Sequence, residues 1–187
     1  CVIPIYTRIM AQEQYGYYTT FISWMSIISV IATLNLSYHV YYNGLMKYKN
    51  EVDEYTSSML GLSAVITVTV FSIYMIGRGF FNQILGFSTI YMVFMFLEIL
   101  LQPSFEFWAA YQRFIYSYKK LSFLTLLLAV IVPIISVPAV LLVAEESKGI
   151  VAVMCKVIVT CTIYFIPFIY LLRKRKSLYN REYWKFA

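Results

Sequence analysis

Long apolar runs separated by short polar segments fill most of this chain of 187 residues. A helix needs about 20 mainly apolar residues to cross a hydrocarbon core about 30 Å thick. Five runs are about that long, at residues 17–40, 57–76, 84–111, 121–144 and 150–172. The third run differs from the others because Glu98, Pro103 and Glu106 interrupt it. The pattern therefore predicts five membrane-spanning helices.

Composition supports the same fold class. Hydrophobic residues make up 61% of the chain and charged residues 13%, whereas soluble domains carry about 25% charged residues. The chain opens on Cys1-Val2-Ile3-Pro4, which is typical of the end of a preceding helix. We therefore expect an all-α, polytopic helical membrane protein with five transmembrane helices and the end of one before them. We also expect the chain to be a fragment of a longer protein.

The cations alternate from loop to loop. Short loops rich in Lys and Arg stay in the cytoplasm. Three segments would face the cytoplasm and carry Lys47, Lys49, Arg113, Lys119, Lys120, Arg173, Lys174, Arg175, Lys176, Arg181 and Lys185. The opposite loops carry only Arg8, Arg78 and Lys148. The net charge of +6 thus follows from membrane topology, and nucleic-acid binding is disfavoured.

The chain divides into two parts. Residues 1–172 form the predicted transmembrane bundle, and residues 173–187 form a basic, aromatic tail on the cytoplasmic side. One interpretation of the tail is an amphipathic helix attracted to anionic lipid. The other is an ordinary cluster of cations that stops translocation, and the two are compatible.

Polar residues on one face of the third apolar run are the main functional candidates. Glu98, Gln102 and Glu106 are spaced i, i+4 and i+8, and Arg113 falls in the same arc of a helix. A carboxylate at mid-membrane is costly and should face a cavity or a partner. The face is therefore either a hydrated surface that contacts substrate or protons, or the site of a structural Glu paired with a cation. Pro103 predicts a kink beside it.

Three other polar residues have open interpretations. Lys156 lies inside the last apolar run and either extends toward the interface or faces the same cavity as Glu98. Arg8 lies at the outer end of the first segment, where a cation alone would be an interface anchor. His39 is the only histidine and is typical of a packing or interface position rather than a proton site.

Motifs for catalysis and cofactor binding are missing from the sequence. It has no glycine-rich phosphate loop, no pair of histidines and no acidic cluster for a metal. Cys155 and Cys161 lie in an apolar helix and are interpreted as small packing residues. We therefore expect a transporter without a cofactor or metal rather than an enzyme.

Four stretches of sequence resemble one family in the same order. They are Pro4-Ile5-Tyr6-Thr7-Arg8-Ile9-Met10 with Glu13-Gln14-Tyr15-Gly16-Tyr17, Tyr42-Asn43-Gly44-Leu45-Met46-Lys47-Tyr48 with Glu54-Tyr55-Thr56-Ser57-Ser58, Phe107-Trp108-Ala109-Ala110-Tyr111-Gln112-Arg113-Phe114 with Tyr118-Lys119-Lys120-Leu121, and Tyr183-Trp184-Lys185-Phe186-Ala187. Together they resemble the N-terminal half of bacterial polysaccharide flippases, a family of the multidrug/oligosaccharidyl-lipid/polysaccharide exporter superfamily.

The resemblance implies a fold about twice this length, with two six-helix lobes, of which this chain would be most of the first. It implies translocation of undecaprenyl-pyrophosphate-linked oligosaccharide across the bacterial inner membrane, for O-antigen, capsule or a related polymer. The expected partners are that substrate, membrane lipids and the polysaccharide polymerase machinery. Arg8 and Arg113 are the cations in family-like motifs that would hold the pyrophosphate.

Physical reasoning adds Lys156 to the expected substrate-binding residues, and Glu98, Gln102 and Glu106 as cavity-lining or coupling residues. A cation-coupled drug or toxin exporter is the first alternative, since it would share the fold. A membrane glycosyltransferase, polymerase or ligase of the same pathway is the second, although the predicted outer loops are short. A non-catalytic membrane scaffold is the third.

Overall fold

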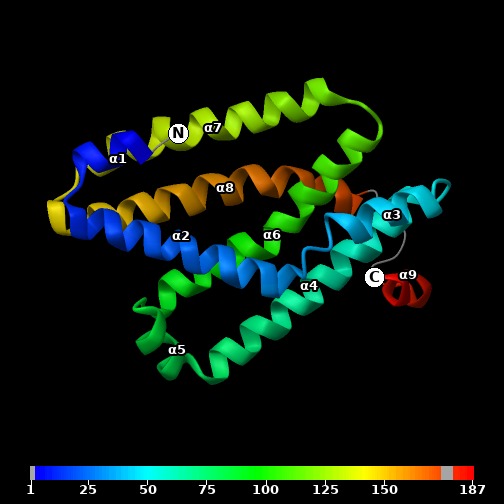
Figure 1. The fold of residues 1–187 in the computed structure, drawn as a ribbon, viewed down its shortest axis with the longest axis horizontal. Coiled ribbons are helices and arrows are strands. Elements are labelled where there is room, and N and C mark those ends of the chain that lie inside the picture. The colour runs from blue at the N-terminus through cyan, green and yellow to red at the C-terminus, as the bar shows by residue number, and fades with distance from the viewer. Residues whose placement is uncertain (1–2, 174–178) are drawn as a thin grey trace.

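The computed structural model describes residues 3–173 and 179–187, and every regular element in these ranges is a helix (Figure 1). In chain order the elements are α1 (Ile3–Ile9), α2 (Gln12–Thr33), α3 (His39–Lys47), α4 (Val52–Ile76), α5 (Arg78–Leu85), α6 (Thr89–Phe114), α7 (Tyr118–Leu141), the 3-10 turn η1 (Glu145–Ser147), α8 (Lys148–Arg173) and α9 (Arg181–Phe186). The all-α prediction is confirmed for this part of the chain. Cys1 and the predicted cytoplasmic cations Lys174, Arg175 and Lys176 lie outside it.

Four of the described helical segments are long and apolar enough to cross a membrane: 52–76, 89–114, 118–141 and 145–173. They correspond to α4, α6, α7 and α8 with its preceding turn. These helices agree with four predicted spans to within a few residues at most ends, so this is a helical membrane protein. The long helix α2 has 22 residues, which is about 33 Å of helix. Its sequence is richer in Tyr, Ser and Thr, and a fifth span there stays a prediction.

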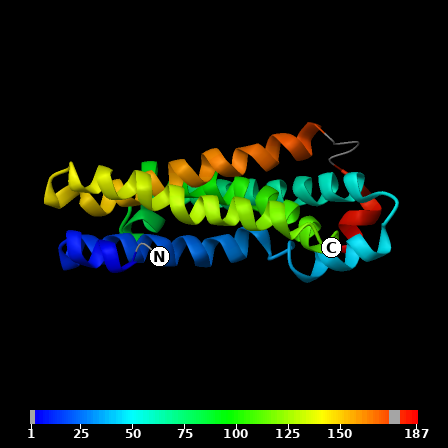
Figure 2. The same ribbon diagram turned by 90° about the horizontal axis from the view of Figure 1, so that it is seen from above.

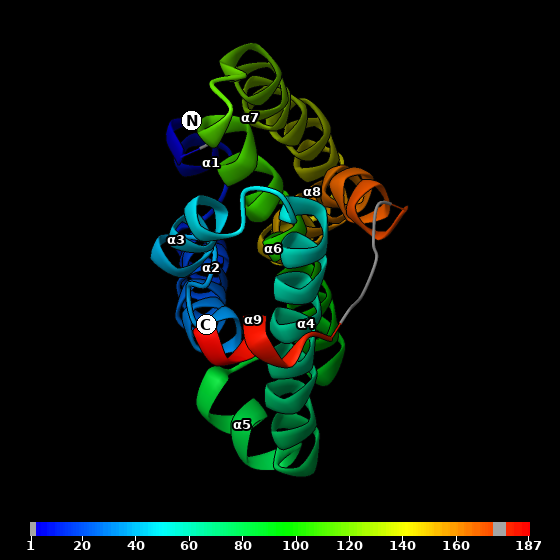
Figure 3. The same cartoon turned by 90° about the vertical axis from the view of Figure 1, so that its right-hand side faces the viewer.

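Helices α2, α7 and α8 run roughly along the long axis of the molecule, and α4 and α6 cross them obliquely (Figure 1). Helix α8 lies among α2, α6 and α7 (Figures 1 and 2). The α1–α2, α4–α5 and α7–α8 connections lie toward one end of this axis. The α3–α4 and α6–α7 connections and α9 lie toward the other end, as Figure 3 shows from that side. The loops that the charge pattern assigns to opposite membrane faces are therefore at opposite ends of the bundle.

Side-chain contacts tie together the connections at the predicted outer end. The backbone N–H of Ala11 donates to Glu145 Oε1 at 2.7 Å, and Lys148 Nζ donates to the Ile9 carbonyl at 2.8 Å. The N–H of Gly149 donates to Gln14 Oε1 at 3.1 Å. These contacts fix the α1–α2 turn against the start of α8, so α2 and α8 enter the bundle side by side.

The predicted span 17–40 is wrong at its C-terminal end. Helix α2 stops at Thr33, and Leu34 and Asn35 follow with φ values of 49° for both. Left-handed backbone of this kind ends a right-handed helix and costs a non-glycine residue about 1–2 kcal/mol. The chain then turns and starts α3 at His39, so the polar end of the predicted span becomes a separate helix.

The predicted span 84–111 is wrong at its N-terminal end. Residues 84 and 85 close the short helix α5, and Gly86 ends it with φ 74°. Glycine adopts this conformation without steric cost. Helix α6 begins afterwards at Thr89 and continues without interruption through Pro103 to Phe114. The three polar residues predicted to share one helix face thus remain on a single helix.

Aromatic packing holds the predicted cytoplasmic end together. Tyr55 is fully buried, and its ring stacks on Tyr41 with centroids 5.7 Å apart. The ring also contacts Tyr48 and Tyr183. A side chain on Gly44 would collide with the Tyr55 ring. Close approach of α3 to α4 therefore depends on a glycine, and it creates the surface on which α9 packs.

Candidate functional site

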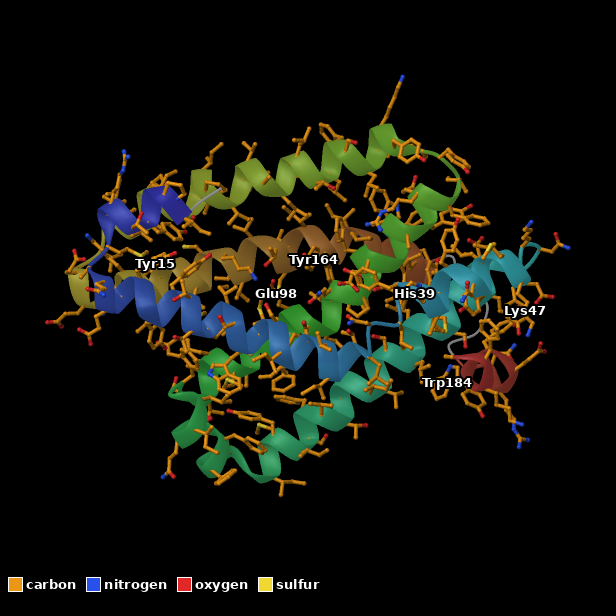
Figure 4. All side chains as sticks on the ribbon, viewed as in Figure 1. Tyr15, His39, Lys47, Glu98, Tyr164 and Trp184 are labelled. Carbon is orange, nitrogen blue, oxygen red and sulfur yellow. The ribbon has the colours of Figure 1, made fainter. Side chains whose placement is uncertain are left out.

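A buried ion pair joins α6 to α8 near the middle of the bundle (Figure 4). Nζ of Lys156 lies 2.6 Å from Oε1 of Glu98, whose residue surface is only 3% exposed. The same Nζ lies 3.5 Å from the thioether sulfur of Met25 on α2. Lys156 therefore points into the interface of three helices. Of its two predicted orientations, it has the inward one.

The pair explains how a carboxylate is accommodated at this depth. Isolated charges inside a protein or membrane cost several kcal/mol, and a close opposite charge offsets much of that cost. The second oxygen, Glu98 Oε2, is buried and makes no hydrogen bond of good geometry with the described residues. The hydroxyl of Thr160 on α8 lies close to this carboxylate and is able to donate to it.

Glu106 lies two helical turns further along α6 and has different neighbours. Its Oε2 accepts a hydrogen bond of 2.5 Å from Ser37 Oγ, in the turn between α2 and α3. Its Oε1 accepts a hydrogen bond of 2.6 Å from Gln102 Nε2. Glu106 thus fixes the break after α2 to the face of α6. We call Glu98, Gln102, Glu106 and Arg113 the α6 polar track.

A cavity of about 260 Å³ adjoins the far end of this track. We call it the α3–α6 cavity. Its lining residues are Ser37, Tyr38, His39, Tyr42, Asn43, Phe105, Glu106, Ala109, Ala110 and Arg113. His39 and Arg113 are both exposed, so the cavity offers two basic groups beside a carboxylate that Ser37 and Gln102 already hold. Aromatic rings and the Asn43 amide complete the lining, whose surface is mainly apolar with a few polar groups.

The α6 polar track connects the cavity to the ion pair. Glu98 and Arg113 are 15 residues apart on one continuous helix, which is about 22 Å at 1.5 Å per residue. Polar groups thus extend from the predicted cytoplasmic end toward the middle of the bundle. Five of the six predicted site residues belong to this arrangement: Arg113, Lys156, Glu98, Gln102 and Glu106.

Arg8 is the exception among the predicted site residues. It is exposed in the last turn of α1, and the α1–α2 connection lies at the end of the bundle opposite the turn that precedes His39 (Figure 4). The neighbouring side chain that enters the bundle is Tyr6, whose hydroxyl donates to Ser136 Oγ at 2.6 Å. The structure therefore does not bring Arg8 together with the α6 polar track.

Sequence analysis gave no site role to three participants, which are Ser37, Met25 and Asn43. Asn35 was a usable signal, because Asn favours turns and left-handed backbone. A turn there would have moved Ser37 and His39 out of a continuous helix and beside the next polar face.

The described residues contain no group of three or more His, Cys, Asp or Glu side chains that could hold a metal ion. Cys155 and Cys161 are free thiols, both partly buried on α8. This agrees with their interpretation as packing residues.

No family model matches the chain, and neither a curated protein nor a solved structure shows significant similarity to it. Functional assignment therefore depends on the geometry of the site and on the motif resemblance given above.

Proposed function

We propose that this chain is a lobe of a flippase that moves undecaprenyl-pyrophosphate-linked oligosaccharide across the bacterial inner membrane. The observation that supports this most is the α6 polar track, which runs from a cavity at one end of the bundle to a buried ion pair. Membrane transporters place such polar groups on helices that face their substrate path. The protein would act as a transporter and not as an enzyme.

The proposed substrate suits a groove of mixed character. A pyrophosphate cannot enter bare hydrocarbon, whereas its polyprenyl tail can remain in the lipid. Arg113 would contact the pyrophosphate first, at the predicted cytoplasmic end, because it is exposed in the α3–α6 cavity. Asn43 and the Tyr38 and Tyr42 rings of the same cavity would contact sugar.

Deeper in the bundle, the ion pair would respond to the substrate. An anion that approaches Lys156 competes with Glu98. A carboxylate that loses its cation in a buried site takes up a proton more readily. Glu98, with Gln102 and Glu106 on the same face, would therefore couple substrate movement to a proton or another cation. Arg8 would act at the outer end.

The partners under this proposal are the lipid-linked oligosaccharide, membrane lipids and the polysaccharide polymerase that receives the product. Translocation in proteoliposomes, followed by an enzyme that reacts only with sugars outside, tests the proposal. Arg113→Ala should reduce the initial rate at least 5-fold, while Lys119→Ala, a matched loss of one exposed cation at the same end, should leave it unchanged. Equal rates for wild type and Arg113→Ala would contradict the role given to Arg113.

A second candidate is a cation-coupled exporter of organic cations. The observation that favours it is the Glu106 carboxylate beside Tyr38, Tyr42 and Phe105 in one cavity, a combination that attracts cations. The two candidate functions predict different effects of removing the negative charge of Glu106. Glu106→Gln should abolish export of an organic cation, whereas a flippase with its anionic substrate should retain binding in this variant. Binding of both ligand classes to the complete protein distinguishes the candidates.

A further inference from the structure

A second cavity lies between α4 and α8, at the end of the bundle where α9 packs. Its volume is about 370 Å³, and its lining is almost entirely apolar. Residues of three elements and the segment before α9 surround it, including Gly61, Ala64, Phe168, Leu172, Tyr179 and Trp184. We call it the α4–α8 groove.

The shape of the groove follows from side-chain size. Gly61 and Ala64 are three residues apart and so lie on one face of α4, where their small side chains leave space between α4 and α8. Phe168 and Leu172, four residues apart on α8, form the opposite wall. On α4 the groove extends from Leu60 to Val65. Six residues of helix span about 9 Å, which is long enough for the first part of an acyl chain.

Helix α9 fixes the mouth of the groove. Trp184 Nε1 donates to the backbone carbonyl of Ser58 at 3.1 Å, and the Tyr179 ring packs edge-on against Trp184 with centroids 4.8 Å apart. The buried Tyr183 anchors the helix from its other side, since its hydroxyl donates to Glu51 Oε2 at 2.6 Å. Trp and Tyr favour the level of lipid headgroups, so the mouth lies where a phosphate would be.

Three exposed cations are close in the chain to residues that line the groove. Arg173 follows Leu172 directly, Lys185 follows Trp184, and Arg181 lies one turn before Lys185 on α9. The nearby carboxylates have other partners: Glu51 accepts from Tyr183, Glu182 accepts from Tyr48, and Glu54 accepts from Asn180. These acids lie at the contact of α9 with α3 and α4. The lining of the groove is therefore apolar, and the three exposed cations adjoin it in the chain, whereas these acids lie on the other contact of α9.

We propose that the α4–α8 groove binds one anionic phospholipid, with an acyl chain between α4 and α8 and its phosphate against Arg173, Arg181 and Lys185. Charge complementarity selects this occupant over a zwitterionic lipid, because anionic headgroups attract juxtamembrane Lys and Arg. The bound lipid joins α9 to α4 and α8 and thereby stabilises the docked position of α9. This site is separate from the α6 polar track and does not depend on the proposed function.

Thermal unfolding of the purified protein in detergent tests the proposal, with phosphatidylglycerol or phosphatidylcholine as the added lipid. Phosphatidylglycerol should raise the Tm more than phosphatidylcholine does, with saturation at one lipid per chain in native mass spectrometry. Arg181→Gln/Lys185→Gln should weaken this binding at least 5-fold. Lys119→Gln/Lys120→Gln, which removes two exposed cations elsewhere at the same end, should leave it unchanged.

A second variant tests the groove itself. Ala64→Leu fills the space between α4 and α8 and should abolish saturable binding, whereas Val130→Leu on the exposed face of α7 should not. Equal stabilisation by the two lipids would overturn the proposal. An equal loss of phosphatidylglycerol binding in both double cation variants would also overturn it. A concentration-dependent dimer that Ala64→Leu disrupts would instead assign the groove to a second copy of the chain. Should Ala64→Leu not fold, the cation variants decide the question alone.

Discussion

Lys156 and Glu98 lie 58 residues apart in sequence, yet the ammonium of one is 2.6 Å from the carboxylate of the other. The pair lies between α6 and α8, and Met25 of α2 completes its surroundings. The packing of three helices thus buries two charges that no single one of these helices could bury.

Removal of one member of this pair should destabilise the protein strongly. Glu98→Gln or Lys156→Met alone leaves an uncompensated buried charge or acceptor, with an expected loss of about 3–5 kcal/mol. The double variant should lose clearly less than the sum of the single variants. Denaturant unfolding in detergent measures all three, and Glu146→Gln, at an exposed position in η1, is the control. Additive losses would mean that the two charges do not interact.

The two ends of the bundle should face opposite sides of the membrane. With Cys1, Cys155 and Cys161 replaced by Ala, we expect Lys119→Cys to be labelled only after the cells are opened. Arg78→Cys should be labelled by an impermeant reagent in intact cells, because both positions are exposed at opposite ends of the molecule. The reason is the unequal distribution of Lys and Arg between the two sets of loops. The reverse labelling pattern would invert the topology.

Even the methyl group of alanine at position 44 should destabilise the protein. A Cβ at this position would overlap the ring of Tyr55, which is fully buried among other aromatic rings and cannot move aside. Gly44→Ala should therefore lower the free energy of unfolding by about 1–3 kcal/mol. Gly16→Ala is the matched control. No atom lies within 4 Å of its added Cβ, and Ala should stabilise the helix by about 0.5–1 kcal/mol.

In the break after α2, a substitution by glycine should stabilise the protein instead of destabilising it. Leu34 has φ 49° and is 58% exposed, so Leu34→Gly removes left-handed strain while little packing is lost. The Tm should rise, since this strain costs about 1–2 kcal/mol. Val30→Gly, inside α2 and 50% exposed, should instead lose about 1 kcal/mol through helix propensity. A lower Tm for Leu34→Gly would indicate a continuous helix through this position.

High pH should release α9. Burial of the ring, together with the hydrogen bond to the Glu51 carboxylate, raises the pKa of Tyr183 above its ordinary value of 10.0. Because the pKa is raised in the docked state, this contribution is complete below pH 10 and is lost as pH rises above it. Trp184 fluorescence should report the release in a chain with Trp24→Phe and Trp108→Phe. Tyr183→Phe, which keeps the ring and removes the proton, should flatten that pH dependence.

Hydrophobic runs and loop charges determined much of this fold. They predicted the fold class and four of the helices to within a few residues at most ends, because about 20 apolar residues bounded by polar loops have few alternatives to a spanning helix. Helical spacing alone also placed Glu98, Gln102 and Glu106 on one face of α6. Local patterns carry this information, since each depends on neighbours within a few turns of the same helix.

Tertiary structure decided which polar residues meet. Sequence spacing could not choose between two orientations for Lys156, and contact with Glu98 and Met25 set the inward one. Helical spacing alone did not end α2 at Thr33 either, although Asn35 favours a turn there, and the Ser37 contact with Glu106 accompanies the strained turn. The position of Arg8, apart from the α6 polar track, likewise depends on how the helices pack. Contacts between helices depend on how their faces pack, and no local pattern in the chain specifies that pairing.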